Sequence, residues 1–289
     1  MSEAGEPRPI CNICRTALRP LTGDEETPHC PTCRSNRRMR ALIALLSREL
    51  YGVTIALPDF PSMKSVRGLG MSDWPVVADQ LAQKFDYINT FYDRPPYFDV
   101  TNAGQHREQY DFILSSEVME HVAPPVDKAF ATLASMLKPD GVLVMTTPYS
   151  LLDETIEHFS DLHEYAIVKL GERVVLVNRK RDGTVEIHED LMFHGGVGAT
   201  LEMRVFSRQS LEEMLKAAGF SGIHFQTEHW GAFGVDMSGP CSLPLAARKG
   251  KFRAPVEDIT MSYVTLQRVC ERRRWRWVRR ITRKLGLTG

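Results

Sequence analysis

The feature that most constrains the fold of this chain is an alternation of short apolar segments with amphipathic stretches that begins after Pro61. The apolar segments have the β-branched and aromatic composition of strands: SVRGLG, DYINTFY, YFDVTN, YDFILSS and GVLVMTTP. The stretches DWPVVADQLAQKF and VDKAFATLASMLKPDG have apolar residues at helical spacing. Strands that alternate with helices of about 10–15 residues predict an α/β protein with a parallel sheet. Ligands of such sheets bind beyond the carboxyl ends of the strands.

The composition is that of a globular protein with a sizeable core, since 43% of the residues are hydrophobic and 25% are charged. The formal net charge is zero, but its distribution is uneven. Nine Lys or Arg residues and one Glu lie between Arg268 and Lys284, so this tail carries +8 and the remainder −8. The chain has no run of about 18–20 apolar residues, and its polar start, MSEAGEPRPI, is unlike a signal peptide. We therefore expect a cytoplasmic location.

Two Cys-x-x-Cys pairs near the amino terminus predict a metal site. Cys11 and Cys14 form one pair, Cys30 and Cys33 form the other, and 15 residues separate the pairs. Four thiolates complete a tetrahedral zinc site, with Zn–S distances of about 2.3 Å, and leave no open position, so the ion is expected to be structural. Two disulfides are the alternative, which a reducing cytosol disfavours. Residues 1–38 are therefore predicted to form a zinc ribbon, and RSNRRMRALIALLSREL a helix that joins it to the body.

The chain departs from the simple alternation after GVLVMTTP. Residues 151–206 form a polar, His-rich insertion in which ETIEHFSDLHEY is expected to be helical. KLGERVVLVNRKRDGTVEIHE has two β-rich runs around Asp182-Gly183, which predicts a hairpin. SRQSLEEMLKAAGF is predicted to be a helix that Ser207 or Ser210 caps, and SGIHFQTEHW a strand.

The order of these elements and two local motifs resemble the class I S-adenosylmethionine (SAM)-dependent methyltransferases over roughly residues 66–230. In that family an acidic residue follows a strand, a Glu-His step opens the next helix, and Leu-Lys-Pro-Gly-Gly leads into the following strand. Here Glu117, Glu120-His121 and the segment LKPDG stand at those places, and SRQSLEEMLKAAGF resembles a later helix of the family. The resemblance implies a Rossmann-like sheet with helices on both faces. More narrowly, the chain resembles a bacterial subgroup with an amino-terminal four-Cys zinc ribbon, a G-L-G-x-S-D turn and an H-G-G-x-G insertion.

The resemblance also implies a cofactor site at the segment SVRGLGMSDW. The glycine turn with Gly68 and Gly70 would hold the methionine part of SAM, because the backbone approaches the ligand closely there. The acidic residue that usually precedes the first glycine is replaced by Val66, and the usual third glycine is absent. Ser72 and Asp73 are therefore candidates for binding the charged amino group of the cofactor. Asp73 is also expected to cap the helix that follows.

Three acidic residues complete the cofactor site that the resemblance implies. Glu117, across the site, is a further candidate for the amino group. Asp93 is expected to accept from both ribose hydroxyls, with Tyr92 as the other candidate. Asp99 is expected to contact the adenine amino group. A turn or cap role is the alternative for each of these residues.

Transfer of a methyl group from a sulfonium to a hydroxyl requires in-line alignment and removal of the hydroxyl proton. Histidine is the usual base, because its pKa lies near neutrality. The candidates are His121, His158, His163 and His194. His158 is the first choice because it follows the fifth strand, where this fold places acceptor-binding residues, and His194, in a turn that could close over the site, is the second. His121 lies at the cofactor edge. A structural role is the alternative for each, and Glu117-x-x-Glu120-His121 also permits a divalent metal.

We therefore expect a SAM-dependent methyltransferase domain at residues 39–240 that methylates a hydroxyl of a small molecule, saccharide or glycoconjugate. RNA methylation with the zinc ribbon and basic tail is one alternative, which the acidic body disfavours. A non-catalytic scaffold with a degenerate SAM site is another. Residues 241–289 form an extension whose tail, RVCERRRWRWVRRITRKLGLTG, has a narrow apolar stripe among arginines. The tail fits peripheral contact with an anionic inner-membrane surface, packing on the body or, less well, nucleic acid.

Overall fold

A computed structural model describes residues 8–19, 29–102, 104, 106–194, 200–237, 242 and 244–250. The α-helices of this part of the chain are α1 (Arg37–Tyr51), α2 (Pro75–Lys84), α3 (Asp127–Met136) and α4 (Arg208–Ala217). Its 3₁₀ helices are η1 (Leu57–Asp59), η2 (Met119–His121) and η3 (Gly231–Phe233). None of these helices is long and apolar enough to cross a membrane. The basic tail lies outside the described residues.

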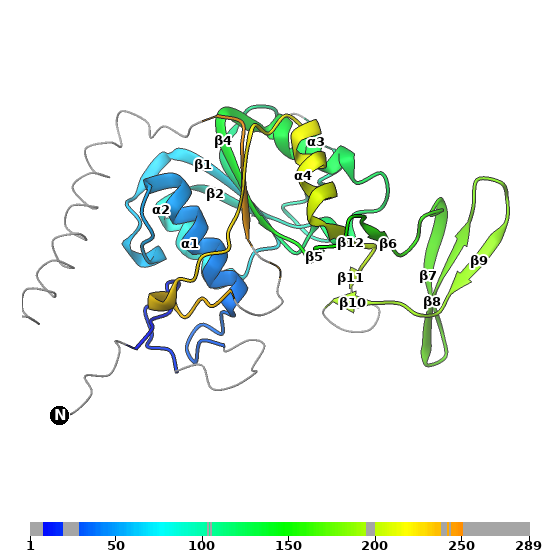
Figure 1. Ribbon diagram of the computed structural model, residues 1–289, viewed down its shortest axis with the longest axis horizontal. Coiled ribbons are helices and arrows are strands. Elements are labelled where there is room, and N and C mark those ends of the chain that lie inside the picture. The colour runs from blue at the N-terminus through cyan, green and yellow to red at the C-terminus, as the bar shows by residue number, and fades with distance from the viewer. Residues whose placement is uncertain are drawn as a thin grey trace, which may run out of the picture.

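A six-stranded sheet, ordered β13-β14-β4-β3-β1-β2, runs through the centre of the molecule (Figure 1). Its strands are β1 (Met63–Met71), β2 (Phe85–Thr90), β3 (Tyr110–Ser116), β4 (Leu137–Thr146), β13 (Gly222–Phe225) and β14 (Leu245–Arg248). The pairs among β1 to β4 are parallel, whereas β14 is antiparallel to both of its neighbours. The chain order reverses between β1 and β3, and open α/β sheets bind ligands at such a point. The predicted α/β fold with a mostly parallel sheet is confirmed.

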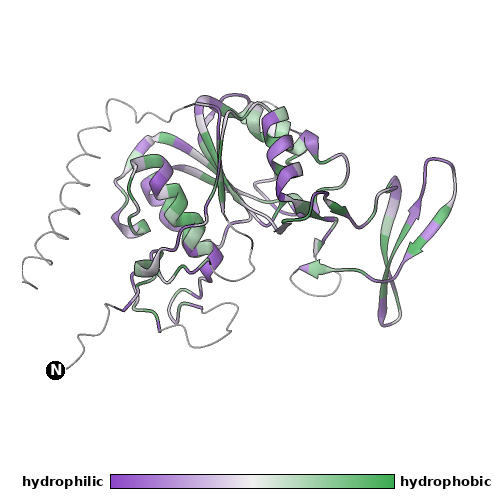
Figure 2. Ribbon diagram, in the orientation of Figure 1, coloured by the Kyte–Doolittle hydropathy of each residue, from purple (hydrophilic) through white to green (hydrophobic). Residues whose placement is uncertain are grey.

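Helices cover both faces of this sheet (Figure 1). Successive residues of a strand point to opposite faces. Phe112 and Leu114 of β3 pack in one hydrophobic cluster with residues of α1 and α2, and Ile113 packs in another with residues of α3 and α4. Figure 2 shows apolar residues gathered in the central strands and along α1. The predicted helix at α1 is confirmed; Asn36 caps its start and Gly52, with φ of 69°, ends it.

The helix expected in ETIEHFSDLHEY is absent, and this prediction was wrong. The segment contains the short strand β6 (Ile156–Glu157), which pairs with β12 (Arg204–Ser207). The N–H of His158 also donates to the carbonyl of Met203 over 2.9 Å. Pairing with residues far along the chain thus overrides the local helical pattern. The strand expected at YFDVTN is likewise reduced to an isolated bridge between Phe91 and Tyr97.

The insertion forms small sheets next to the central one. β5 (Tyr149–Ser150), β12 and β6 make one sheet, and β10 (Phe193–His194) pairs with β11 (Thr200–Leu201). A three-stranded antiparallel sheet projects from the body (Figure 1). Its strands are β7 (Glu164–Leu170), β8 (Arg173–Arg179) and β9 (Val185–His188). The pairing of β8 with β9 confirms the hairpin predicted around Asp182-Gly183.

The two Cys-x-x-Cys turns share one backbone conformation. The residue after the second cysteine of each pair, Arg15 or Arg34, has a left-handed φ of 65° or 60°. The N–H of that residue donates to the carbonyl of the first cysteine, over 2.7 Å in one turn and 2.9 Å in the other. Cys11 and Ile13 are buried in the same cluster as residues of α1 and α2. The cysteine segment therefore packs on the sheet-bearing body.

Candidate functional site

The carboxyl ends of β3 and β4 form the centre of the candidate site. The side-chain oxygens of Ser116 and Thr146, the last residues of these strands, lie 3.0 Å apart. The chain then turns sharply, since Glu117 has a left-handed φ of 54° and its N–H donates to the carbonyl of Thr146 over 3.0 Å. Such a conformation is uncommon for a residue other than glycine and is typical of functional sites. It places Glu117 at the edge where ligands of α/β sheets bind.

The Glu117 carboxylate has one paired oxygen and one unpaired oxygen. Oε2 lies 3.0 Å from a guanidinium nitrogen of Arg38 and accepts a hydrogen bond from Ser242 over 2.9 Å. Oε1 is buried and has no hydrogen-bond partner among the described residues. A buried carboxylate oxygen without a partner is costly in the absence of a ligand. Because Arg38 belongs to the first turn of α1, the helix after the cysteine segment also contacts this edge.

The two glycines of the predicted cofactor turn lie inside β1. A Cβ at Gly68 would collide with the ring of Phe112 on the neighbouring strand β3. A Cβ at Gly70 would collide with the Asp73 carboxylate and the Tyr87 hydroxyl. The turn itself follows at Ser72, whose φ is 58° and whose N–H donates to the carbonyl of Thr90 at the end of β2 over 2.7 Å. Packing within the protein therefore already requires both glycines.

Asp73 is a buried side chain and does not cap α2. The N-cap of α2 is Trp74, which makes no side-chain capping bond. The hydroxyl of Tyr87 donates to the Asp73 carboxylate, and the amide of Asn89 holds the Asp73 backbone through two hydrogen bonds of 3.0 Å each. Burial raises the pKa of Asp73 to about 6, although the bond from Tyr87 opposes this rise. The turn after β1 is thus fixed to β2 through polar contacts.

The other two predicted cofactor residues lie beyond β2. Asp93 is exposed. Asp99 is also exposed, and its Oδ1 accepts from the N–H and the hydroxyl of Thr101 over 2.8 Å each. The structure does not bring Asp99 into contact with Glu117 or Asp73. The local turn at Asp99 is the role that the sequence offered as its alternative.

The structure brings two of the predicted histidines together around a carboxylate. The rings of His121 and His194 meet edge to face, with their centroids 4.8 Å apart. His121 Nε2 lies 3.6 Å from Glu120 Oε1, and His194 Nδ1 lies 3.8 Å from the same oxygen. Glu120 is fully buried, and burial, followed by the nearby charge of Glu117, raises its pKa to about 8. Burial lowers the pKa of His121, which favours the neutral imidazole.

Glu202 links the third predicted histidine to this group. Its two carboxylate oxygens lie 3.0 Å from His158 Nε2 and 3.0 Å from His194 Nε2. Glu202 is mostly buried, whereas His158 is 31% exposed along its side chain and so can be reached by a ligand. A histidine oriented by a buried carboxylate has the arrangement of a general base. His163 does not belong to this cluster: it directly precedes β7, and its backbone N–H donates to the Asn178 side chain on β8 of the projecting sheet.

Sequence reasoning missed Glu202 and Arg204. Arg204 is fully buried and donates to Glu157 over 2.7 Å and to the carbonyl of Met119 over 3.3 Å, so it fixes η2 against β12. The N–H of Met203 also donates to the carbonyl of Glu120 over 2.8 Å. No local motif marks these residues, because their role comes from strand pairing across the insertion.

The four cysteines predicted as metal ligands form one cluster, with their sulfurs within 4.8 Å of one another. Cys11 and Cys33 sulfurs are 3.6 Å apart, Cys14 and Cys30 sulfurs are 3.4 Å apart, and all four cysteines are free. A tetrahedral site with bonds of about 2.3 Å has sulfurs about 3.8 Å apart. The N–H of Ile13 donates to the Cys11 sulfur over 3.4 Å, which suits a thiolate. The cluster therefore fits a zinc ion.

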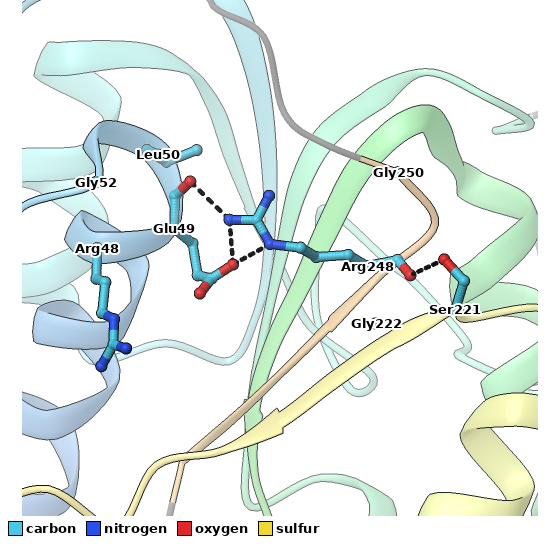
Figure 3. Close-up of a pocket in the computed structure, with 8 residues that line it drawn as sticks. All are labelled: Arg48, Glu49, Leu50, Gly52, Ser221, Gly222, Arg248 and Gly250. Atoms are coloured by element: carbon cyan, nitrogen blue, oxygen red, sulfur yellow. Dashed lines mark hydrogen bonds and ion pairs between the residues drawn. The ribbon is translucent and has the colours of Figure 1, made fainter.

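A cavity of about 590 Å³ lies at the opposite edge of the sheet (Figure 3). Two of its charged lining residues already pair with each other, since the Arg248 guanidinium donates to the side chain and the backbone carbonyl of Glu49. It is lined by the start of β13 and the end of β14, far along these strands from the Glu117 edge. The cavity thus lies between the end of α1 and the sheet, and none of the predicted site residues lines it.

A family model described as a methyltransferase domain matches residues 73–225 of this chain. Three similar solved structures are bacterial methyltransferases. They are the 1,6-didemethyltoxoflavin-N1-methyltransferase of Burkholderia thailandensis (16% identity, 74% of this chain and 78% of that chain, TM-score 0.39), the sugar N-methyltransferase KedS8 of Streptoalloteichus (13%, 72% and 85%, 0.40) and the amino pentose methyltransferase CalS10 of Micromonospora echinaspora (15%, 74% and 92%, 0.39). The comparison with curated proteins gave no match.

Proposed function

Because the chain belongs to the methyltransferase-domain family, we propose that it transfers the methyl group of SAM to a hydroxyl of a small molecule, a saccharide or a glycoconjugate. The expectation of a methyltransferase is confirmed at the level of the family. The observation that carries the proposed acceptor chemistry is the contact of His158 with Glu202 over 3.0 Å. A hydroxyl acceptor needs a base, and this histidine has both a carboxylate that orients it and partial exposure.

We place the donor at the carboxyl ends of β1, β2 and β3. Glu117 supports this position, since its buried Oε1 has no hydrogen-bond partner within the described part of the chain and could accept from the charged amino group of the cofactor. Gly68, Gly70, Ser72 and Asp73 would form the wall on the β1 side. The exposed Asp93 and Asp99 are proposed to contact the ribose and the adenine.

We propose His158 as the base. When its Nε2–H donates to Glu202, its Nδ1 retains the lone pair and can accept the acceptor's proton. The bond between the sulfonium sulfur and the methyl carbon breaks as the bond from the acceptor oxygen to that carbon forms, and the proton passes to Nδ1. In His121 and His194, the ring nitrogen that is not held by Leu201 or Glu202 faces the buried Glu120, which makes both weaker candidates for this role.

The experiment is methyl transfer from labelled SAM to cell extract separated into small-molecule, saccharide and RNA fractions. We expect labelling of the first or second fraction and a loss of about 10²–10⁴ in kcat for His158→Ala, without a change in SAM affinity. His229→Ala is the matched control, because His229 is an exposed histidine that pairs with a different carboxylate, Asp236, over 2.8 Å. Near-normal turnover by His158→Ala would exclude His158 as the base. Labelling of the RNA fraction alone would favour RNA methylation.

A non-catalytic scaffold is the second candidate, and one observation favours it. The Asp73 carboxylate and the Tyr87 hydroxyl fill the space next to Gly70 that the resemblance assigns to the cofactor. If calorimetry detects no SAM binding in the micromolar range, the scaffold replaces the enzyme.

We also propose a structural zinc ion held by Cys11, Cys14, Cys30 and Cys33, which would make residues 1–38 the zinc ribbon of the predicted bacterial subgroup. For residues 241–289, peripheral contact of the basic tail with an anionic membrane surface stays a proposal. Co-sedimentation with anionic liposomes, compared with the chain truncated after Gln267, tests it. Equal sedimentation of the two would contradict it.

A further inference from the structure

Three donor atoms from separate parts of the chain converge on one point at the carboxyl edge of the sheet. They are Glu120 Oε1, His121 Nε2 and His194 Nδ1, and they all lie within 4.8 Å of one another. Glu120 and His121 come from η2 after β3, whereas His194 comes from β10 in the insertion. A ligand bound to this cluster would therefore join the insertion to the body.

Hydrogen bonds on the far side of each ligand point the lone pairs inward. His121 Nδ1 lies 2.8 Å from the carbonyl of Leu201, which can only accept, so Nδ1 carries the hydrogen and Nε2 has the lone pair. His194 Nε2 lies 3.0 Å from Glu202, so its Nδ1 has the lone pair. Histidine ligands of metal ions are oriented in this way by a carbonyl or a carboxylate behind the ring.

The Glu120 carboxylate is also held from behind, with one oxygen pointing toward the other two ligand atoms. Glu120 Oε2 accepts a hydrogen bond from the Thr147 hydroxyl over 3.0 Å. Its Oε1 faces both histidine nitrogens, is buried, and has no hydrogen-bond partner among the described residues. With both inward nitrogens lacking a hydrogen, neither can donate to this oxygen. A fully buried carboxylate oxygen that faces two lone pairs is repelled by them unless a proton or a metal ion lies between them. A proton bridges this oxygen to only one of the two nitrogens, whereas a metal ion accepts lone pairs from all three atoms at once.

We propose that Glu120, His121 and His194 bind a divalent first-row transition-metal ion, at a site distinct from the four-cysteine cluster. Two imidazoles and one carboxylate suit Zn²⁺, Mn²⁺, Fe²⁺ or Co²⁺ better than Mg²⁺ or Ca²⁺. Metal bonds of about 2.0–2.2 Å place tetrahedral ligand atoms roughly 3.4 Å apart. The separations of 3.6 and 3.8 Å from Glu120 Oε1 therefore need to shrink by only a few tenths of an ångström.

Three protein ligands leave coordination positions open for an oxygen of another molecule. His158 shares Glu202 with His194, so the base proposed for methyl transfer lies one residue away from the metal site. The metal would bind the acceptor hydroxyl and lower its pKa beside this base. This role in catalysis rests on the proposed function, whereas metal binding does not.

The experiment titrates the full-length protein with Co²⁺ while zinc occupies the four-cysteine cluster. We expect one further equivalent of Co²⁺ that gives weak visible bands of a nitrogen and oxygen environment without thiolate-to-cobalt charge transfer. His194→Ala and His121→Ala should lose this equivalent. Glu202→Gln should weaken it by about 10–100-fold, because Glu202 orients His194 from behind. His229→Ala should bind as the wild type does.

Two results would overturn the metal site. One is retention of the Co²⁺ equivalent, with unchanged affinity, in both His194→Ala and His121→Ala. The other is a spectrum with thiolate charge transfer only, which would place all bound cobalt at the cysteines. Circular dichroism of each variant shows whether it is folded; His194, with a side chain 35% exposed, is the substitution least costly to the core. SAM binding, measured separately by calorimetry, distinguishes failure of the metal site from failure of the proposed function.

Discussion

Asp73 shows how a residue assigned to a ligand can have a structural role. Its carboxylate lies against Tyr87 and over Gly70, so the motif G-L-G-x-S-D has an explanation within the protein. The sequence could not show this, because the contact joins the turn after β1 to β2. The sequence showed that Gly68, Gly70 and Asp73 lie close together around one turn. It could not show that Tyr87 is the partner of the Asp73 carboxylate, because that contact depends on tertiary packing.

The raised pKa of Asp73 gives a prediction for stability. The folded-state pKa of about 6 lies above the ordinary value of 3.8, so the folded state binds the proton more tightly than the unfolded state. The wild type should therefore lose about 2 kcal/mol of unfolding free energy as the pH rises from 4 to 7. Asp73→Asn should lack this loss and be more stable than the wild type at pH 7 but not at pH 4. Urea unfolding at both pH values measures it; parallel pH dependence of the two proteins would contradict it.

At the scale of elements, the sequence predicted the central strands and the helices of the sheet, because their apolar periodicity decides which face is buried. It failed at residues 154–165, where β6 forms through pairing with β12. Arg204 lies on β12, opposite Glu157 of β6, and Glu202 lies two residues before it. The site residues that sequence reasoning missed therefore lie on or next to the pairing partner of the segment that was wrongly expected to be helical. The histidines and Glu117 could be named as candidates from their residue type and their position in the sequence. That His121 and His194 both face Glu120 could not be predicted, because it depends on how the insertion folds.

Arg204 links the insertion to η2 and the residue after it through its buried side chain. Its removal leaves Glu157 and the carbonyls of Met119 and Val122 without their donor. We expect Arg204→Ala to lower the unfolding free energy by about 2–4 kcal/mol. Arg173→Ala is the control, since the Arg173–Glu189 pair is exposed on both sides and should contribute less than about 0.5 kcal/mol. Equal effects of the two substitutions in urea unfolding would refute this role of Arg204.

On the scale of the whole molecule, the cysteine segment and the body share one hydrophobic core. Arg40 of α1 donates to the carbonyls of Ser35, Phe233 and Gly234, and Arg38 reaches Glu117. Loss of the proposed zinc ion should therefore affect both stability and the carboxyl edge of the sheet.

We expect Cys30→Ser to lower the unfolding free energy by roughly 3 kcal/mol or more, since loss of a structural metal is among the few causes of large effects. It should also weaken SAM binding through Arg38 and Glu117. Cys270→Ser, which removes a cysteine that belongs to neither Cys-x-x-Cys pair, should change neither quantity. Zinc content, thermal unfolding and calorimetry check these outcomes together; full zinc content in Cys30→Ser would contradict the proposed ligand set.

The proposed methyl transfer depends on SAM binding at the carboxyl edge of the sheet beside Glu117. Isothermal titration of the full-length protein with SAM tests it most directly, with Glu117→Gln as the variant and Glu189→Gln, an exposed glutamate of the insertion, as the control. We predict micromolar binding to the wild type and the control, and at least about tenfold weaker binding to Glu117→Gln, since a charge-assisted hydrogen bond contributes about 1.5–3 kcal/mol. Absence of binding to the wild type, or equal binding to all three proteins, would contradict this placement of the donor.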